Sequence, residues 1–169
     1  MTAALGRQKE QLDEVTRTLT AKSWFRRDGW IAATHYFPKT SPIGVTLNVF
    51  KAHWLNDARD GIHIETFLGK GTIAGAKSYV ALHVFHKDSV PGSKLKRKAI
   101  TKPFVDAIYE DVAAWPGYAF RAGKYGMQPF TYKFVVAEKG YVKMLSAELE
   151  RVCRVVGPAM DRVLEEVFG

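Results

Sequence analysis

Two segments in the middle of the chain alternate between apolar and polar residues. Gly61–Phe67 reads G-I-H-I-E-T-F, and Tyr79–Lys87 reads Y-V-A-L-H-V-F-H-K. Because successive side chains of a strand point to opposite faces, this alternation predicts two strands, each with an aliphatic face and a mixed face. On the mixed faces we expect His63, Glu65 and Phe67 from the first strand and Tyr79, His83 and Phe85 from the second.

Two earlier segments also predict strands. Trp30–Phe37 reads W-I-A-A-T-H-Y-F and ends before a proline, and Val45–Trp54 begins with alternating apolar and polar residues. The links between the four strands are short, which favours an antiparallel order. The mixed face of the sheet is then expected to include Asn48, Phe50 and either His35 or Tyr36.

Three segments predict helices from the spacing of their apolar residues. Ala3–Lys22 has a narrow apolar stripe, and a second helix is expected to begin with Thr101 as its N-cap and to end near Trp115. The last helix, Tyr141–Phe168, has an apolar stripe along nearly its whole length. Gly157-Pro158 falls inside it and predicts a kink or a short break.

The order of these elements indicates the fold class. Two further predicted strands, Tyr118–Arg121 and Phe130–Val136, give the order helix, four strands, helix, two strands, helix. Strands that are grouped, rather than alternating with helices, favour an α+β fold. We therefore expect an antiparallel sheet of four to six strands packed by an N-terminal, a middle and a long C-terminal helix, with residues 1–169 as one α+β domain.

The amino-acid composition restricts the class of protein and its cellular compartment. Hydrophobic residues make up 47% of the 169 residues and charged residues 25%, as in ordinary globular proteins. Cys153 is the one cysteine, so an intrachain disulfide and a multi-cysteine zinc site are excluded. Met1–Leu12 lacks the apolar core of a signal peptide, and no segment approaches the roughly 20 apolar residues of a membrane span. These features predict a soluble, cytoplasmic protein without a membrane partner.

The charge balance is strongly basic. The net charge is +8 and the isoelectric point is about 9.6, which favours an acidic protein or nucleic acid as partner. The densest basic run lies just before a predicted helix N-terminus, whose amides also attract anions. The candidate anion-binding residues are Lys94, Lys96, Arg97, Lys98, Lys102, Arg121 and Lys124. A basic surface that only keeps the protein soluble is the alternative.

His63, Glu65 and His83 are the candidates for catalysis or ligand binding. A carboxylate beside an imidazole can fix its tautomer, favour its charged form or complete a metal site. Whether these side chains meet depends on the strand register, which the sequence does not give. An ordinary cross-strand hydrogen bond is the alternative, and we assign no metal and no cofactor.

Two other sequence patterns resemble known functional sites but lack a residue that each site requires. Asp57, Asp60 and Glu65 invite comparison with metal-dependent nucleases, but Phe67 stands where those sites need a lysine. The segment Gly69–Thr72 lacks the glycine that a phosphate-binding loop requires five positions before its lysine.

Three functional classes fit the sequence. The first is a non-enzymatic binding module that presents its basic surface to an acidic partner. The alternative is a small hydrolase that acts on a phosphate-containing substrate with His63, Glu65 and His83 on the open sheet face. A third is a structural subunit that forms a homodimer through its long helices.

Overall fold

The computed structural model describes residues 3–56, 61–69, 77–119, 125–135 and 139–169. Four helices and six strands follow one another within these ranges. They are α1 (Ala3–Thr20), α2 (Ser23–Arg27), β1 (Trp30–Phe37), β2 (Gly44–Lys51), β3 (His63–Gly69), β4 (Lys77–His83), α3 (Lys98–Ala113), β5 (Tyr118–Ala119), β6 (Phe130–Val135) and α4 (Tyr141–Phe168). Apart from the short α2, this is the predicted order.

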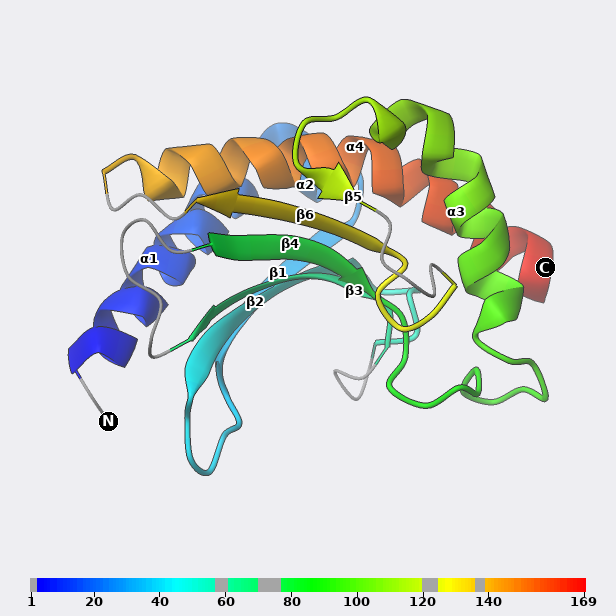
Figure 1. Cartoon of the computed structure of the whole chain (residues 1–169), viewed down its shortest axis with the longest axis horizontal. Coiled ribbons are helices and arrows are strands. Elements are labelled where there is room, and N and C mark those ends of the chain that lie inside the picture. The colour runs from blue at the N-terminus through cyan, green and yellow to red at the C-terminus, as the bar shows by residue number, and fades with distance from the viewer. Residues whose placement is uncertain (1–2, 57–60, 70–76, 120–124, 136–138) are drawn as a thin grey trace.

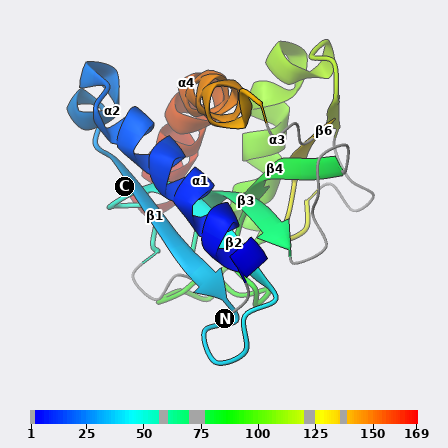
Figure 2. The same cartoon turned by 90° about the vertical axis from the view of Figure 1, so that its left-hand side faces the viewer.

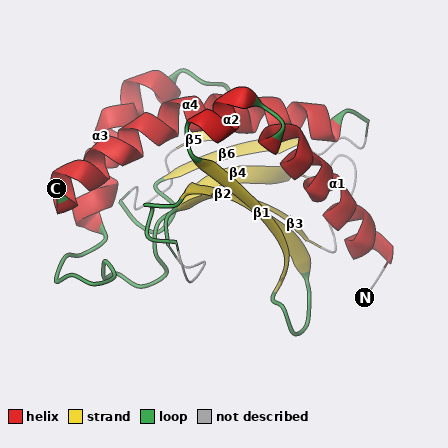
Figure 3. Ribbon diagram, turned by 180° about the vertical axis from the view of Figure 1, so that it is seen from behind, coloured by secondary structure: helices red, strands yellow, loops and turns green. Residues whose placement is uncertain are grey.

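The strands form one antiparallel sheet in the order β1-β2-β3-β4-β6-β5. The sheet is strongly arched, and the helices lie on its outer, convex side (Figure 1). Seen from the end, α1 lies along β1 and also contacts β2, and α4 lies beside α1 (Figure 2). The predicted α+β fold with an antiparallel sheet is therefore confirmed, and none of the described helices covers the concave side of the sheet (Figure 3).

Strand register places the aliphatic side chains on the helix-covered face. Val45 pairs with Leu68 and Val49 pairs with Ile64, and all four side chains are at most 1% exposed. They pack in the same core as the apolar stripe of α4. Full burial of one such side chain is worth roughly 1.5–3 kcal/mol. The buried residues of that stripe include Leu145, Leu149, Val152, Val156, Met160 and Val163. The core therefore fixes which face of each strand is left for the concave side.

The sequence predicted a kink or a short break at Gly157-Pro158, and the helix α4 continues through these residues without a break. The glycine has a packing role instead. A Cβ atom at position 157 would lie 2.6 Å from Cζ2 of Trp30. That indole is itself held edge-on against Trp54, with ring centroids 5.2 Å apart. The absence of a side chain at Gly157 therefore lets α4 approach β1 closely.

Two helix boundaries differ from the prediction. Thr101 is not the N-cap of α3, because the helix begins three residues earlier, at Lys98. The Thr101 side chain is buried, and its hydroxyl donates a hydrogen bond to the carbonyl oxygen of Tyr125 at 2.6 Å. A threonine that finds a tertiary acceptor has no need to cap its own helix. Near the N-terminus, Trp24 and Phe25 are buried in the short helix α2, which the sequence pattern did not predict.

Two strands end earlier than predicted. β2 ends at Lys51, because a turn follows in which the Trp54 amide donates to the Lys51 carbonyl at 3.0 Å. β4 ends at His83 rather than Lys87, because the backbone turns at Phe85, where φ is +42°. Phe85 is therefore buried in the core and not on the mixed face, which corrects the prediction. Cys153 is buried, and burial raises the pKa of its thiol.

None of the described helices combines the length and the apolar composition needed to cross a bilayer.

Candidate functional site

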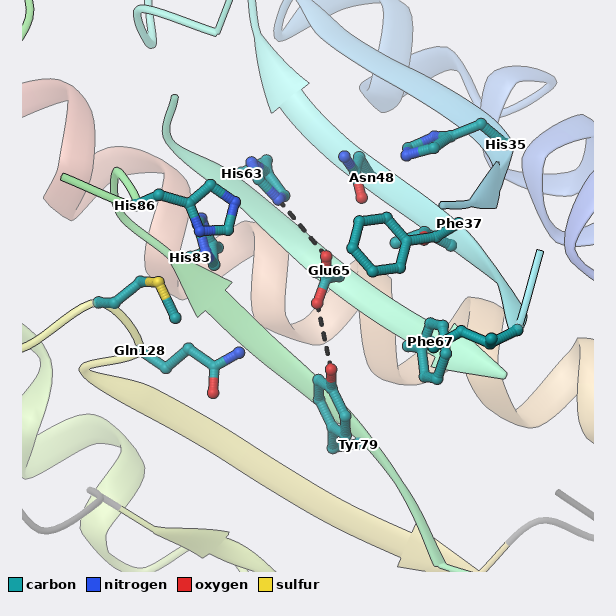
Figure 4. A pocket seen from close by; sticks show the side chains of 13 residues that line it. His35, Phe37, Asn48, His63, Glu65, Phe67, Tyr79, His83, His86 and Gln128 are labelled. Carbon is teal, nitrogen blue, oxygen red and sulfur yellow. Dashed lines mark hydrogen bonds and ion pairs between the residues drawn. The ribbon is translucent and has the colours of Figure 1, made fainter. Parts of the chain in front are cut away.

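A pocket of about 320 Å³ opens on the concave side of the sheet (Figure 4). It is built from β1 to β4 and from the segment that precedes β6. Its walls are His35, Phe37, Ile43, Thr46, Asn48, His63, Glu65, Phe67, Tyr79, His83, His86, Met127 and Gln128. The mixed face predicted from sequence is thus a concave, ligand-sized site rather than a flat surface.

Three histidines form one end of the pocket. His63 and His83 are directly opposite each other on β3 and β4, and their rings stack with centroids 4.8 Å apart. His86 meets His83 edge-on, at a centroid distance of 4.5 Å. Sequence reasoning missed His86, because a regular strand through Lys87 would have turned it away from His83. The turn at Phe85 changes this alternation and brings His86 into the pocket.

Glu65 lies at the centre of the pocket in Figure 4. Its Oε2 is 3.7 Å from Nε2 of His63, and its Oε1 accepts a hydrogen bond from the Tyr79 hydroxyl at 3.2 Å. Burial would raise the pKa of this carboxyl, but the contact with His63 and the charges of both facing imidazoles outweigh it and lower the pKa. Glu65 is therefore a carboxylate at neutral pH, held by partners on both sides.

The tautomer of His63 follows from its neighbours. Nδ1 is 3.1 Å from the carbonyl oxygen of Gly61, which can only accept, so Nδ1 carries a hydrogen. Nε2 is left facing Glu65, and a proton taken up there lies beside a carboxylate. This arrangement can pass a proton between an imidazole and a bound molecule, which is the chemistry of a general acid or base.

His83 differs from His63 in its surroundings. Burial lowers its pKa to about 4, and the charges of His63 and His86 add to the effect. Its ring is therefore neutral at neutral pH. The Nδ1 atom is buried and makes no hydrogen bond, and the same is true of Oδ1 of Asn48 and Oγ1 of Thr46. Each such atom costs about 1–3 kcal/mol when it stays unsatisfied, so a bound molecule that pairs with it gains that amount.

The other end of the pocket is apolar. Phe37 and Phe67 meet edge-on with centroids 6.4 Å apart, and Ile43 stands next to them in the β1–β2 hairpin. A Cβ atom at position 44 would lie 2.3 Å from Cζ of Phe67, so Gly44 makes room for that ring. Phe37 and Ile43 are about half exposed, at 50% and 52%. The pocket therefore has a polar floor and an aromatic rim.

The structure brings His63, Glu65 and His83 together on the concave face, because the strand register places His63 directly opposite His83. It does not turn them into a metal centre. Among the residues that the structure describes, no three His, Cys, Asp or Glu side chains are grouped to hold a metal ion. The rings of His63 and His83 are stacked face to face. Their nitrogen lone pairs therefore do not point toward a common position where a metal ion could bind.

The candidate anion-binding residues have separate environments. Lys94, Lys96 and Lys98 are exposed, and Lys102 forms an exposed ion pair with Asp106. The ammonium groups of Lys98 and Lys102 lie 5.7 and 5.9 Å from the centroid of the Tyr125 ring. Two further candidates, Arg121 and Lys124, lie outside the described residues, as do Asp57 and Asp60.

The side chain of Arg97 contacts the protein backbone and is less exposed to solvent than the other basic side chains of this segment. Its guanidinium donates to the carbonyl oxygen of His86 at 3.2 Å, and its side chain is half-buried. It therefore holds the segment that carries His86 at the edge of the pocket. No sequence pattern indicates this role, because it depends on the turn at Phe85.

No protein-family model, curated protein or solved structure matches the chain.

Proposed function

We propose that the protein binds a small organic molecule in the concave pocket of its sheet. The observation that carries this proposal is the polar floor, where buried atoms of Asn48, Thr46 and His83 lack hydrogen-bond partners. Unpaired buried atoms occur elsewhere in the protein too, but these three belong to residues that line one pocket, where a ligand can pair with them. A volume of about 320 Å³ is of the size that accepts a ligand of one or two rings.

We expect the neutral dye N-phenyl-1-naphthylamine to bind the pocket and to fluoresce when the aromatic rim excludes water. Phe67→Ala should weaken its binding about tenfold, because the variant removes one ring of the rim. The measurement is a fluorescence titration at pH 7.5. Leu95→Ala, which truncates an exposed apolar side chain outside the pocket, is the matched control and should leave the affinity unchanged. The proposal fails if the dye does not bind, or if both variants bind it as the wild type does.

The basic segment supports a second proposal, that an acidic partner docks beside the pocket. The supporting observation is that Lys94, Lys96 and Lys98 are exposed within a few residues of the N-terminus of α3. An acidic protein and nucleic acid both remain candidates. The homodimer through the helices and the cytoplasmic location stay predictions.

Replacing Lys94, Lys96 and Lys98 together by glutamine should weaken binding of heparin, an acidic probe, at least tenfold in 50 mM salt and flatten its salt dependence. Neutralising three cations removes the counterion release that drives such binding. A triple variant on the helix-covered side of the molecule, Lys9, Lys22 and Lys143 to glutamine, has the same net charge and should bind nearly as wild type. Equal loss in both variants would show that net charge, not this segment, is responsible.

The hydrolase alternative stays a hypothesis for the same pocket. Its support is the His63–Glu65 pair beside a neutral His83. The described lining holds no lysine or arginine, so it offers a phosphate group no fixed cation. Turnover of a bound molecule that Glu65→Gln abolishes would establish catalysis.

A further inference from the structure

The arrangement of the pocket assigns a chemical class to its ligand. We propose that it takes an uncharged ring compound that carries a hydrogen-bond donor, with the ring against Phe37 and Phe67 and the donor on Oδ1 of Asn48. This inference rests on the proposed ligand-binding function. It goes further by fixing the charge, the polarity and the orientation of the bound molecule.

The orientation follows from strand register. Phe37 pairs with Gly44, Phe67 pairs with Thr46, and Asn48 pairs with Glu65. On the concave face these pairs form successive rows along β2, from the aromatic rim toward the histidines. Rows two residues apart are separated by about 6.7 Å. A ring system that lies in the aromatic rows therefore projects a substituent into the row of Asn48 and Glu65.

The need for a donor follows from the atoms in that row. Asn48 is 4% exposed, and its Oδ1 is an acceptor without a partner. Glu65 is a carboxylate, so it too only accepts. Thr46 lies one row nearer the aromatic rim and is 2% exposed. Its hydroxyl has no partner and can either donate or accept a hydrogen bond. A ligand that brings only acceptors would leave Asn48 unsatisfied.

The lack of charge follows from what lines the pocket. An anion would meet the carboxylate of Glu65 with no lysine or arginine among the described lining residues to offset it. A cation would be drawn to Glu65, but burial, which is the main cause of the low pKa of His83, disfavours a positive charge on this floor, and the charges of His63 and His86 add to the effect. Burial of an unpaired ion is far more costly than burial of a hydrogen-bonded hydroxyl. A neutral hydroxyl or N–H group fits both constraints.

Three probes with one naphthalene ring separate these features. 2-Naphthol has a neutral donor, 2-methoxynaphthalene has the same ring without a donor, and 2-naphthoate is an anion at pH 7.5. In calorimetric titrations of the full chain we expect 2-naphthol to bind about tenfold more tightly than 2-methoxynaphthalene, because the ether leaves the amide oxygen unsatisfied. The naphthoate should bind weakest of the three.

A side-chain replacement then locates the donor. Asn48→Leu keeps the size of the side chain and removes its acceptor, so the variant should bind 2-naphthol and 2-methoxynaphthalene equally well. Gln11→Leu, an amide replacement on α1, should keep the tenfold preference. Circular dichroism verifies the fold of both. A preference that survives in Asn48→Leu would overturn the assignment to Asn48. Should Asn48→Leu not fold, Asn48→Ala, which also removes the acceptor, provides the same test.

The outcomes separate this inference from the proposed function. Equal affinities in the wild type, or tightest binding of 2-naphthoate, would overturn the inference and leave a ligand-binding pocket standing. Failure of all three naphthalenes while N-phenyl-1-naphthylamine binds has the same meaning. Failure of all four probes would overturn the proposed function as well.

Discussion

Replacing Asp161 with alanine should lower the free energy of unfolding by about 3 kcal/mol, one of the two largest effects we expect from a single substitution. The carboxylate of Asp161, on α4, accepts hydrogen bonds from the Lys51 ammonium at 2.5 Å, from Trp54 Nε1 at 2.8 Å and from the ring of His53 at 2.8 Å. It therefore ties the last helix to the end of β2 and to the turn that follows.

The size of the effect comes from what the substitution leaves behind. Trp54 is fully buried, so its indole N–H would lose its partner without gaining water. The Lys51 side chain is only 13% exposed and would keep a charge without a carboxylate beside it. Burial alone would raise the pKa of Asp161, but these donors outweigh it and lower the pKa, so the bonds stabilise the ionised form. Asp161 is itself partly exposed, which keeps the loss below that of a fully buried pair.

Urea unfolding at pH 7 measures the loss, and the midpoint of thermal unfolding should fall by roughly 10 °C. Asp161→Asn keeps an acceptor for Trp54 and should lose about half as much. Asp106→Ala removes an exposed ion pair with Lys102 and should cost less than about 1 kcal/mol. An Asp161→Ala variant no less stable than Asp106→Ala would show that the three hydrogen bonds contribute little to folding.

Sequence pattern was sufficient for the sheet but not for Asp161. Alternation of apolar residues fixes which face of a strand is buried, and that rule assigned Val45, Val49 and Ile64 correctly. Asp161 is separated from Trp54 by 107 positions, and the pattern of α4 shows only that it lies off the apolar stripe. Which residue it meets depends on how α4 packs on the sheet, where Gly157 lies against the ring of Trp30 at the start of β1.

The candidate site shows the same division. Strand alternation placed His63, Glu65 and His83 on one face, and the register that makes the two histidines opposite each other came only with the structure. His86 was missed because one residue, Phe85, adopts a positive φ and ends the alternation. A non-glycine residue rarely does so, and no local sequence rule indicates it. Met127 and Gln128 enter from a connecting segment, where alternation has no meaning.

Acidification from pH 6.5 to pH 4 should lower the free energy of unfolding by about 3 kcal/mol through His83 alone. In the folded protein, burial and the nearby charges of His63 and His86 hold the pKa of His83 at about 4, whereas an unfolded histidine titrates near 6.5. As the pH falls between these values, the unfolded chain takes up a proton that the folded chain does not. Stability is therefore lost toward acid, by about 1.4 kcal/mol per pH unit inside this window.

The carboxylates act in a lower range. The pKa values of Glu65 and Asp161 are lowered by folding, so their contributions are fully present above the ordinary carboxyl values of 4.5 and 3.8 and disappear below them. Urea unfolding at pH 7.5, 6.5, 5.5 and 4.5 therefore stays at or above these carboxyl values, and comparison with a His83 variant isolates the histidine contribution. His83→Phe keeps a ring between His63 and His86 but has no imidazole to protonate. The slope of the free energy of unfolding against pH, between pH 6.5 and pH 4.5, should therefore decrease by about 1.4 kcal/mol per pH unit, the contribution of one proton.

The same titration tests the dryness of the pocket floor. A neutral His83 with a buried, unpaired Nδ1 exists only where water does not reach the ring, since a solvated imidazole would titrate near its ordinary value. NMR spectra of ring-labelled histidine should show one resonance that titrates near pH 4. A bound ligand that carries a hydrogen-bond donor should lower the apparent pKa of His83 further, because it pairs with the buried acceptors of the pocket without adding a charge. The His83 resonance should then keep its neutral position to a lower pH. All histidine resonances titrating close to pH 6.5 would mean a hydrated floor, and the unpaired atoms of Asn48 and Thr46 would then be satisfied by water rather than by a ligand.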